Sequence, residues 1–228
     1  MRSFFKRAPS PRGFTLVELL VVSLIIVFIT AFVLFRQQGF NSATLLRSLS
    51  YGVALSVRQA QVYGVSVRES AAGSGVFAAG YGVQFGNSGL VDSSHYLLFA
   101  DANGNGQYTA GEELPRFTIG NGRGTDYFIS NICAHSIVSG DQCSASSPPT
   151  SPTISSLSVY FRRPNPDACF ATNTSPTACA VGTAPVYDYA YVQIKPFVGT
   201  DYRTIKITST GQIAVCKPNL DAAGVAAC

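Results

Sequence analysis

Apolar and polar residues are unevenly distributed along this chain, and the longest apolar run lies near its start. From Phe14 to Phe35, every residue is apolar or carries a small hydroxyl, except Glu18. About 20 helical residues cross the hydrocarbon core of a bilayer, and no Pro or Gly interrupts the run before Gly39. The pattern therefore predicts a transmembrane helix over residues 14–38.

The residues that follow keep a helical period but become amphipathic. Apolar side chains recur at steps of three or four residues, at Leu46, Leu49, Val53, Val57 and Ala60. Polar residues occupy the other faces, as expected for a helix that lies on a sheet. We therefore expect an amphipathic second half of the helix over residues 39–64.

Beyond Gly64 the helical period gives way to short runs rich in β-branched and aromatic residues. The predicted strands are Val76–Phe85, His95–Ala100, Leu114–Ile119, Thr153–Arg162, Val186–Lys195, Tyr202–Thr208 and Gln212–Cys216. The last two flank Ser209-Thr210-Gly211, which predicts a hairpin turn. The predicted fold is α+β: a long N-terminal helix packed on a mainly antiparallel β-sheet head that occupies residues 65–228.

The formal net charge of +4 arises at the N-terminus. Four basic residues precede the apolar run with no acid among them, Arg2, Lys6, Arg7 and Arg12, and the rest of the chain has equal numbers of basic and acidic residues. Basic residues before a membrane span keep the N-terminus in the cytoplasm, so the head is expected outside it. The neutral remainder has no bulk attraction for nucleic acid or anionic lipid.

Glu18 is the residue of the apolar run that requires an explanation. A charged side chain costs about 2.5–3.5 kcal/mol at the centre of a bilayer and less near its edge. One interpretation is a signal anchor that carries an acid by accident. The other is that processing creates a partner for it. Cleavage between Gly13 and Phe14 would expose an α-amine four residues before Glu18, on the same helical face.

The sequence GFTLVE, residues 13–18, resembles the processing motif of type IV pilins and pseudopilins, because a short basic leader precedes it and a long apolar helix follows. The resemblance implies that residues 1–13 are a leader peptide and that a prepilin peptidase cuts after Gly13. It also implies that Phe14 becomes the N-methylated terminus. Glu18 would then support the docking of subunits in a helical filament, and the head would have the pilin fold.

The later sequence is similar to GspH/FimT-type minor pseudopilins, through the helix end Leu45–Val67 and the closing stretch ITSTGQIAVC. One feature departs from the wider family. Many type IV pilins carry a Pro about two-thirds along the N-terminal helix, whereas no Pro occurs here between Pro11 and Pro115. Any bend of this helix in a filament would have to arise elsewhere, for example at Gly39.

All six cysteines lie in the C-terminal half of the chain, and six cysteines can pair in 15 ways. Proximity in sequence suggests the disulfides Cys133–Cys143, Cys169–Cys179 and Cys216–Cys228. A zinc site is the alternative, but the chain has no C-x-x-C and its two histidines are not spaced as ligands. Disulfides imply an oxidising location, which agrees with an extracytoplasmic head.

Two segments rich in Ser, Thr and Pro, Ser139–Pro152 and Pro164–Pro185, are predicted to be exposed loops. Each contains one end or both ends of a suggested disulfide. Exposed loops held in this way often recognise partners, and the alternative is that they are variable surface segments without a function of their own.

Residues 101–112 match the EF-hand loop spacing D-x-[DN]-x-[DN]-G-x₅-E. The oxygen ligands for Ca²⁺ would come from Asp101, Asn103, Asn105, Gln107 and Glu112, with a glycine at the turn. The flanking segments are predicted strands rather than helices, so a turn built from Asn-Gly pairs is the alternative. If the loop binds Ca²⁺, we expect weak affinity and a role in stiffening a β–β connection.

The sequence has no nucleophile-elbow, P-loop or dinucleotide-binding motif. His95 and His135 stand in no catalytic pattern, so we predict neither enzymatic activity nor a required cofactor. Five basic residues lie on or beside the C-terminal strands: Arg162, Arg163, Lys195, Arg203 and Lys206. They suggest a DNA-binding minor pilin of an uptake system as an alternative, against which the neutral charge of the body argues.

The sequence thus predicts a structural subunit that is first a single-pass protein of the cytoplasmic membrane. It would then enter a type IV pilus-like filament or the pseudopilus of type II secretion. Its partners would be other pilin or pseudopilin subunits, the prepilin peptidase, the inner membrane and the assembly machinery. The alternative from a different class is a permanently anchored extracytoplasmic binding protein that never polymerises.

Overall fold

The computed structural model describes residues 13–69, 75, 77, 80–86, 92–119, 127–144, 153–180 and 182–217, without the side chains of residues 35–41. The chain divides into two compact units, Met1–Ser42 and Ala43–Cys228. The described residues form an N-terminal apolar helix and two antiparallel sheets. The α+β class predicted from the sequence is therefore confirmed.

Helix α1 (Leu16–Val65) begins with a local capping arrangement. The Thr15 carbonyl accepts a hydrogen bond from the Leu19 amide at 3.2 Å, and Thr15 Oγ1 accepts one from the Glu18 amide at 3.2 Å. Thr followed three residues later by Glu is the sequence pattern of a capping box. The Glu18 carboxylate also lies in the first turn, where the helix dipole favours a negative charge.

The part of α1 in the first unit is apolar and uncovered. Leu16–Leu34 is long and apolar enough to cross a membrane or to act as a signal sequence, and none of this segment is buried. Its hydroxyl groups are satisfied within the helix, because Ser23 Oγ donates to the Leu20 carbonyl at 2.9 Å and Thr30 Oγ1 to the Ile26 carbonyl at 2.7 Å. The segment therefore presents an apolar surface without unpaired hydroxyls, as a lipid environment requires.

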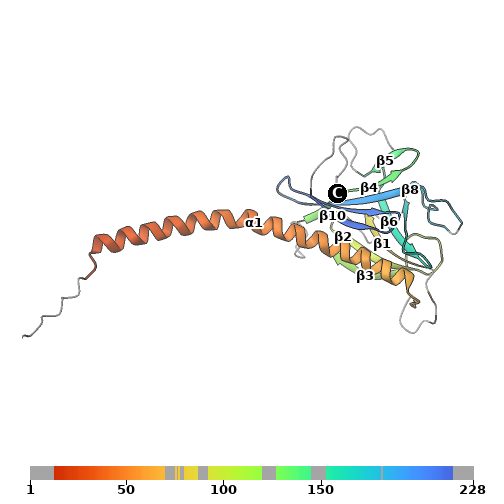
Figure 1. Ribbon diagram of the computed structural model, residues 1–228, viewed down its shortest axis with the longest axis horizontal. Coiled ribbons are helices and arrows are strands. Elements are labelled where there is room, and N and C mark those ends of the chain that lie inside the picture. Colours follow the sequence, from red (N-terminus) through yellow and green to blue (C-terminus); the bar gives the residue numbers. More distant parts are fainter. Residues whose placement is uncertain are drawn as a thin grey trace, which may run out of the picture. The chain divides into compact units, whose positions relative to one another are not determined.

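The described strands of the second unit form two five-stranded antiparallel sheets (Figure 1). The first sheet has the order β3-β2-β1-β6-β7, with β3 (Glu113–Thr118), β2 (His95–Asp101), β1 (Gly80–Gly86), β6 (Ser156–Arg162) and β7 (Ala168–Thr172). The second has the order β10-β9-β8-β4-β5, with β10 (Ile213–Cys216), β9 (Arg203–Thr208), β8 (Tyr187–Pro196), β4 (Tyr127–Ser136) and β5 (Gly140–Cys143).

One hydrophobic core joins both sheets to the last part of α1, which lies alongside the strands in Figure 1. From α1 the core takes Leu46, Val53, Val57 and Ala60, four of the five apolar positions that the sequence pattern singled out. Val83 of β1 and Val192 of β8 are examples of fully buried core residues from the two sheets. Burying one such side chain contributes about 1.5–3 kcal/mol, so the helix stripe is a major part of the fold's stability.

Polar contacts also attach α1 to the strands. The buried Gln61 side chain donates from Nε2 to the Pro166 carbonyl at 2.7 Å and to the Gly211 carbonyl at 3.1 Å. Ser56 Oγ lies 3.0 Å from the hydroxyl of Tyr96 on β2. These bonds connect the helix to both sheets, because Gly211 lies in the turn between β9 and β10.

The first sheet is covered on its outer face as well. Alternate residues of β2 point to opposite faces, so Tyr96 and Leu98 belong to the main core while Leu97 and Phe99 belong to a second cluster. That cluster includes Tyr160, Ala171 and Cys179. Burial on both faces explains why β2 reads as a continuous apolar run rather than an alternating one.

Each predicted strand corresponds to an observed strand, and the β9–β10 hairpin forms at Ser209-Thr210-Gly211 as predicted. The predicted strand Val76–Phe85 corresponds to β1 (Gly80–Gly86), and its predicted residues 76, 78 and 79 lie outside the described residues. The assignment of Ser139–Pro152 and Pro164–Pro185 as loops was wrong in part. The first contains β5 and the second contains β7.

Strand β4 was not predicted from the sequence. Its pairing with β8 shifts register between Ile129 and Asn131 and again between His135 and Ser136. Such irregularities interrupt the alternation of apolar and polar residues that marks a strand in sequence.

Candidate functional site

The first candidate site is the start of α1, at the predicted processing motif. Phe14 is 81% exposed and precedes the helix, which begins two residues later at Leu16. The observed helix therefore starts two residues after the predicted start at residue 14. The N-cap at Thr15 separates a non-helical Gly13-Phe14 from the apolar helix. An exposed, non-helical segment is the form in which a peptidase can bind a backbone.

Glu18 is the single acidic residue of the first unit, Met1–Ser42. It is exposed, and no ion pair of Glu18 occurs among the described residues. In the uncut chain, the Glu18 carboxylate is therefore accessible to a partner.

The second candidate site is the segment from Asp101 to Glu112, called the 101–112 loop below. It connects β2 to β3, as the sequence predicted, and Asp101 is the last residue of β2. The Asp101 side chain is fully buried. Its Oδ1 accepts hydrogen bonds from the amides of Gly104 at 2.7 Å and Asn105 at 3.2 Å, and its Oδ2 accepts one from Gly106 at 2.9 Å. Asp101 thus organises the first turn of the loop.

The amide side chains of the loop converge on a common point. Asn103 Oδ1 accepts from the Asn105 amide and Asn105 Oδ1 from the Gln107 amide, both at 2.9 Å. The side-chain nitrogens of Asn103 and Asn105 reach the same atom, Thr109 Oγ1, at 3.1 and 3.0 Å. Positions three, five and nine of the loop therefore face one another.

Glu112 closes the loop from its other end. Its Oε1 accepts from the amides of Ala102 at 3.0 Å and Asn103 at 3.2 Å, and its Oε2 accepts from the Thr109 amide at 3.0 Å. Burial raises the pKa of Glu112 above its ordinary value, and the negative charge of Asp101 adds to the rise. The structure thus links Asp101, Asn103, Asn105 and Glu112 through hydrogen bonds of one loop, which is flanked by strands rather than helices, whereas Gln107 takes part in these bonds only through its backbone amide.

The 101–112 loop is seated on the outer cluster of the first sheet. A methyl group added at Gly106 would lie 2.5 Å from the Cys179 carbonyl oxygen and 2.6 Å from its Cβ, so the backbone of the loop touches this residue. Tyr160 forms a hydrogen bond with Asp101, and burial followed by the charge of Asp101 raises the pKa of the Tyr160 hydroxyl. The loop is therefore in contact with the Cys169–Cys179 disulfide.

Two of the suggested disulfides are present. Cys133–Cys143 joins directly opposed residues of β4 and β5, and Cys169–Cys179 joins β7 to the segment that follows it. Cys216 is also disulfide-bonded. Cys228, its suggested partner, lies outside the described residues.

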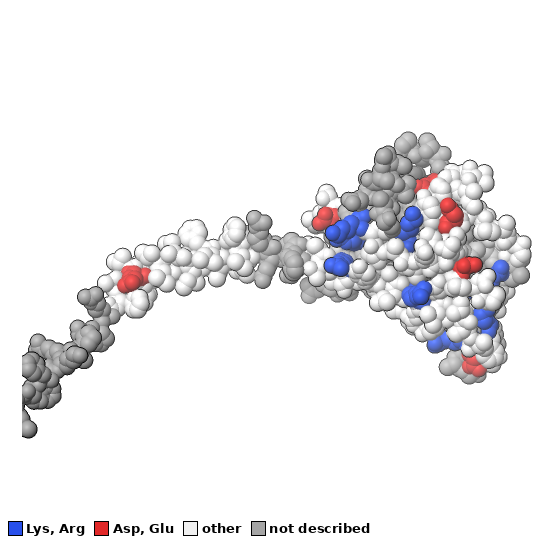
Figure 2. Space-filling view, in the orientation of Figure 1, with Lys and Arg blue, Asp and Glu red and all other residues white. Residues whose placement is uncertain are grey.

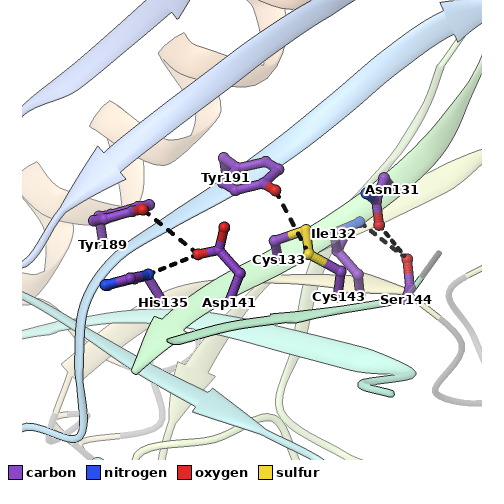
Figure 3. Close-up of a disulfide and its surroundings, with 9 residues drawn as sticks. All are labelled: Asn131, Ile132, Cys133, His135, Asp141, Cys143, Ser144, Tyr189 and Tyr191. Carbon is purple, nitrogen blue, oxygen red and sulfur yellow. Dashed lines mark hydrogen bonds and ion pairs between the residues drawn. A yellow bond between two sulfur atoms is a disulfide. The ribbon is translucent and has the colours of Figure 1, made fainter. Parts of the chain in front are cut away.

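The Cys133–Cys143 disulfide lies beside a polar and aromatic group on the outer face of the second sheet (Figure 3). His135 Nδ1 lies 2.7 Å from Asp141 Oδ1, and the His135 ring stacks on Tyr189 with centroids 4.6 Å apart. The other histidine, His95, pairs with Asp92 at 2.7 Å. Each histidine therefore has a carboxylate partner, and neither of them lies beside a nucleophilic side chain in the described contacts.

The five basic residues of the C-terminal half do not lie on one strand or one sheet. Arg162 ends β6 in the first sheet, whereas Lys195, Arg203 and Lys206 belong to β8 and β9 in the second. Lys206 Nζ lies 4.4 Å from the centroid of the Tyr189 ring. Figure 2 shows basic side chains spread singly over the visible face of the second unit, with acidic ones between them.

Some residues of these sites were missed from the sequence. Thr15 and Thr109 each stand three residues before a glutamate, and the T-x-x-E pattern could have identified both. Tyr160 is distant in sequence from Asp101, so no local signal could have predicted their contact. Comparisons of the chain with protein-family models, with curated proteins and with solved structures found no match.

Proposed function

We propose that this chain is the precursor of a structural subunit of a type IV pilin-like filament, either a pilus or a type II secretion pseudopilus. One observation carries the proposal. A fully exposed apolar helix carries a single carboxylate in its first turn, shortly after a non-helical Gly13-Phe14. In this reading a prepilin peptidase cuts after Gly13, and the N-terminus of the precursor lies in the cytoplasm.

The apolar surface of the helix requires a non-aqueous environment. Leu16–Leu34 buries nothing within its unit, so it requires lipid or other apolar helices to exclude water. A bilayer would hold the segment before assembly, and helices of neighbouring subunits would replace the lipid in a filament. The second unit, residues 43–228, would stay outside the cytoplasm, where its disulfides are stable.

The capped first turn gives Glu18 a specific role. Cleavage would leave a positive α-amine at Phe14, next to the N-terminal end of a helix whose dipole repels positive charge. Glu18 supplies the compensating negative charge, within the same chain or in a neighbouring one. Because the surroundings have a low dielectric, an unpaired charge there is strongly unfavourable. Pairing would therefore favour the docked subunit.

Mass spectrometry of the N-terminus of membrane and filament fractions tests the processing step. We expect a chain that begins at a methylated Phe14. A chain that keeps Met1 in both fractions would instead identify a permanently anchored extracytoplasmic protein.

A substitution tests the assembly step. Glu18→Gln keeps the size of the side chain, and Ser23→Ala is a matched control because Ser23 bonds only within its own helix in the described contacts. We expect both variants to be processed and only Glu18→Gln to be lost from filaments. Normal incorporation of processed Glu18→Gln subunits would refute the pairing.

A further inference from the structure

We propose that the 101–112 loop is a Ca²⁺-binding site that holds the loop against the Cys169–Cys179 disulfide. This inference is independent of the filament function, because it concerns a surface of the head and not the N-terminal helix. It rests on the charges that the fold gathers in the loop and on the oxygen atoms that surround them.

The charges in the loop are not balanced by the protein. Asp101 is 0% exposed and Glu112 is partly buried. Within the described part of the chain, neither carboxylate forms an ion pair with Lys or Arg. Their hydrogen-bond partners are backbone amides and the Tyr160 hydroxyl, all of which are neutral. A buried carboxylate and a partly buried one without a counter-ion among the described residues are costly, and a bound cation removes that cost.

The ligand set suits a hard cation. The side chains at positions one, three, five and twelve carry oxygen, and those at three and five converge on Thr109 at position nine. The Oδ1 atoms of Asn103 and Asn105 each accept one backbone amide of the loop, which leaves a second lone pair on each oxygen for a cation. The set contains no sulfur or imidazole, which disfavours zinc. Its mixture of carboxylate and amide oxygens is typical of Ca²⁺ rather than of the strictly octahedral Mg²⁺.

The contacts of the 101–112 loop indicate which part of the fold a bound cation would stabilise. Gly106 touches Cys179, and Asp101 contacts Tyr160 of the outer cluster. A cation held by Asp101 and Glu112 would fix both ends of the loop and so cover the Cys169–Cys179 segment. With only two charged ligands, we expect a Kd of about 10⁻⁴–10⁻³ M, the range of extracellular modules.

The test is Tb³⁺ luminescence of the full chain in detergent, because a lanthanide at this site would be excited by the adjacent Tyr160. Ca²⁺ is added as the competitor, and the Ca²⁺ affinity is read from the displacement of Tb³⁺. Four proteins are compared: the unchanged chain, Glu112→Gln, Asn105→Asp and the control Glu113→Gln. Glu113 is matched in type and neighbours Glu112, but its carboxylate accepts hydrogen bonds from Tyr108 at 2.6 Å and Gly111 rather than from the residues at the start of the loop.

We expect Glu112→Gln to weaken Ca²⁺ binding about tenfold or more and Asn105→Asp, which adds a charged ligand, to strengthen it about tenfold. Glu113→Gln should change the affinity less than about twofold. Equal Ca²⁺ affinity in Glu112→Gln and the unchanged chain would overturn the proposal. Should Glu112→Gln fail to fold by circular dichroism, Asn105→Asp decides, because an affinity that does not rise overturns the proposal as well. The proposal is also overturned if added Ca²⁺ does not lower the Tb³⁺ luminescence of the unchanged chain.

Discussion

The attachment of α1 to the second sheet can be tested by replacing Gly211 with Ala. Gly211 has a φ of +79°, a conformation that residues with a side chain rarely adopt. The added methyl group would collide with the Pro166 carbonyl oxygen and would lie 2.5 Å from Gln61 Nε2. These are the atoms of the hydrogen bonds by which the helix holds the turn. The substitution should therefore separate Gln61 from both of its carbonyl partners.

The expected loss can be worked out from two contributions. A left-handed conformation costs a residue with a side chain about 1–2 kcal/mol. Leaving the buried Gln61 amide without its partners costs about 1–3 kcal/mol more, because Gln61 is only 4% exposed. We therefore expect Gly211→Ala to lower the free energy of unfolding by about 3 kcal/mol.

Gly140→Ala is the matched control. Gly140 has a similar φ of +73° at the start of β5, directly after the turn from β4, and no atom lies within 4 Å of an added methyl group. It should cost only the conformational part, about 1–2 kcal/mol. Urea unfolding of the full chain in detergent, followed by the near-ultraviolet circular dichroism of its tyrosines, measures both variants. Equal losses for the two variants would refute the account of Gln61. If the account is right, Gly211→Ala should cost much less in a Gln61→Ala background, because the two changes remove the same bonds.

Three further predictions concern the head. Without Ca²⁺, the raised pKa of Glu112 means that its contribution to stability is present below its ordinary pKa and is lost as the pH rises through the raised value. Bound Ca²⁺ would keep the Glu112 carboxylate ionised. The unfolding free energy of the unchanged chain minus that of Glu112→Gln should therefore fall as the pH rises from 4 to 7 without Ca²⁺, and should rise over the same range with Ca²⁺. Saturating Ca²⁺ should slow reduction of Cys169–Cys179 by dithiothreitol, measured by mass spectrometry of alkylated peptides. If Ca²⁺ leaves the rate of reduction unchanged, the 101–112 loop does not protect this disulfide as proposed. Ser56→Ala should cost about 1 kcal/mol and raise the pKa of Tyr96 further, because the Ser56 hydrogen bond opposes the effect of burial. An alkaline absorbance titration that shows no upward shift would contradict this.

Features that depend on neighbours in sequence were accessible without the structure. The apolar helix, the β9–β10 hairpin and the disulfides Cys133–Cys143 and Cys169–Cys179 are of this kind. Each follows from a period, a turn or a short spacing that acts over a few residues. The side chains of the 101–112 loop were found in the same way, because a loop with fixed spacing brings its own ligands together.

The remaining features required the tertiary structure, because they depend on contacts between distant parts of the chain. Strand β4 is irregular in sequence and becomes a strand through its pairing with β8 on one side and β5 on the other. The continuous apolar run of β2 is typical of a strand covered on both faces, but only the structure identifies the segments that cover them. The sequence by itself determined the helix, its carboxylate and the candidate ligands, which are local. Only the fold decided that there are two sheets, and only the fold set Asp101 and Gly106 against Tyr160 and Cys179, because those contacts are made by chain segments that meet through packing.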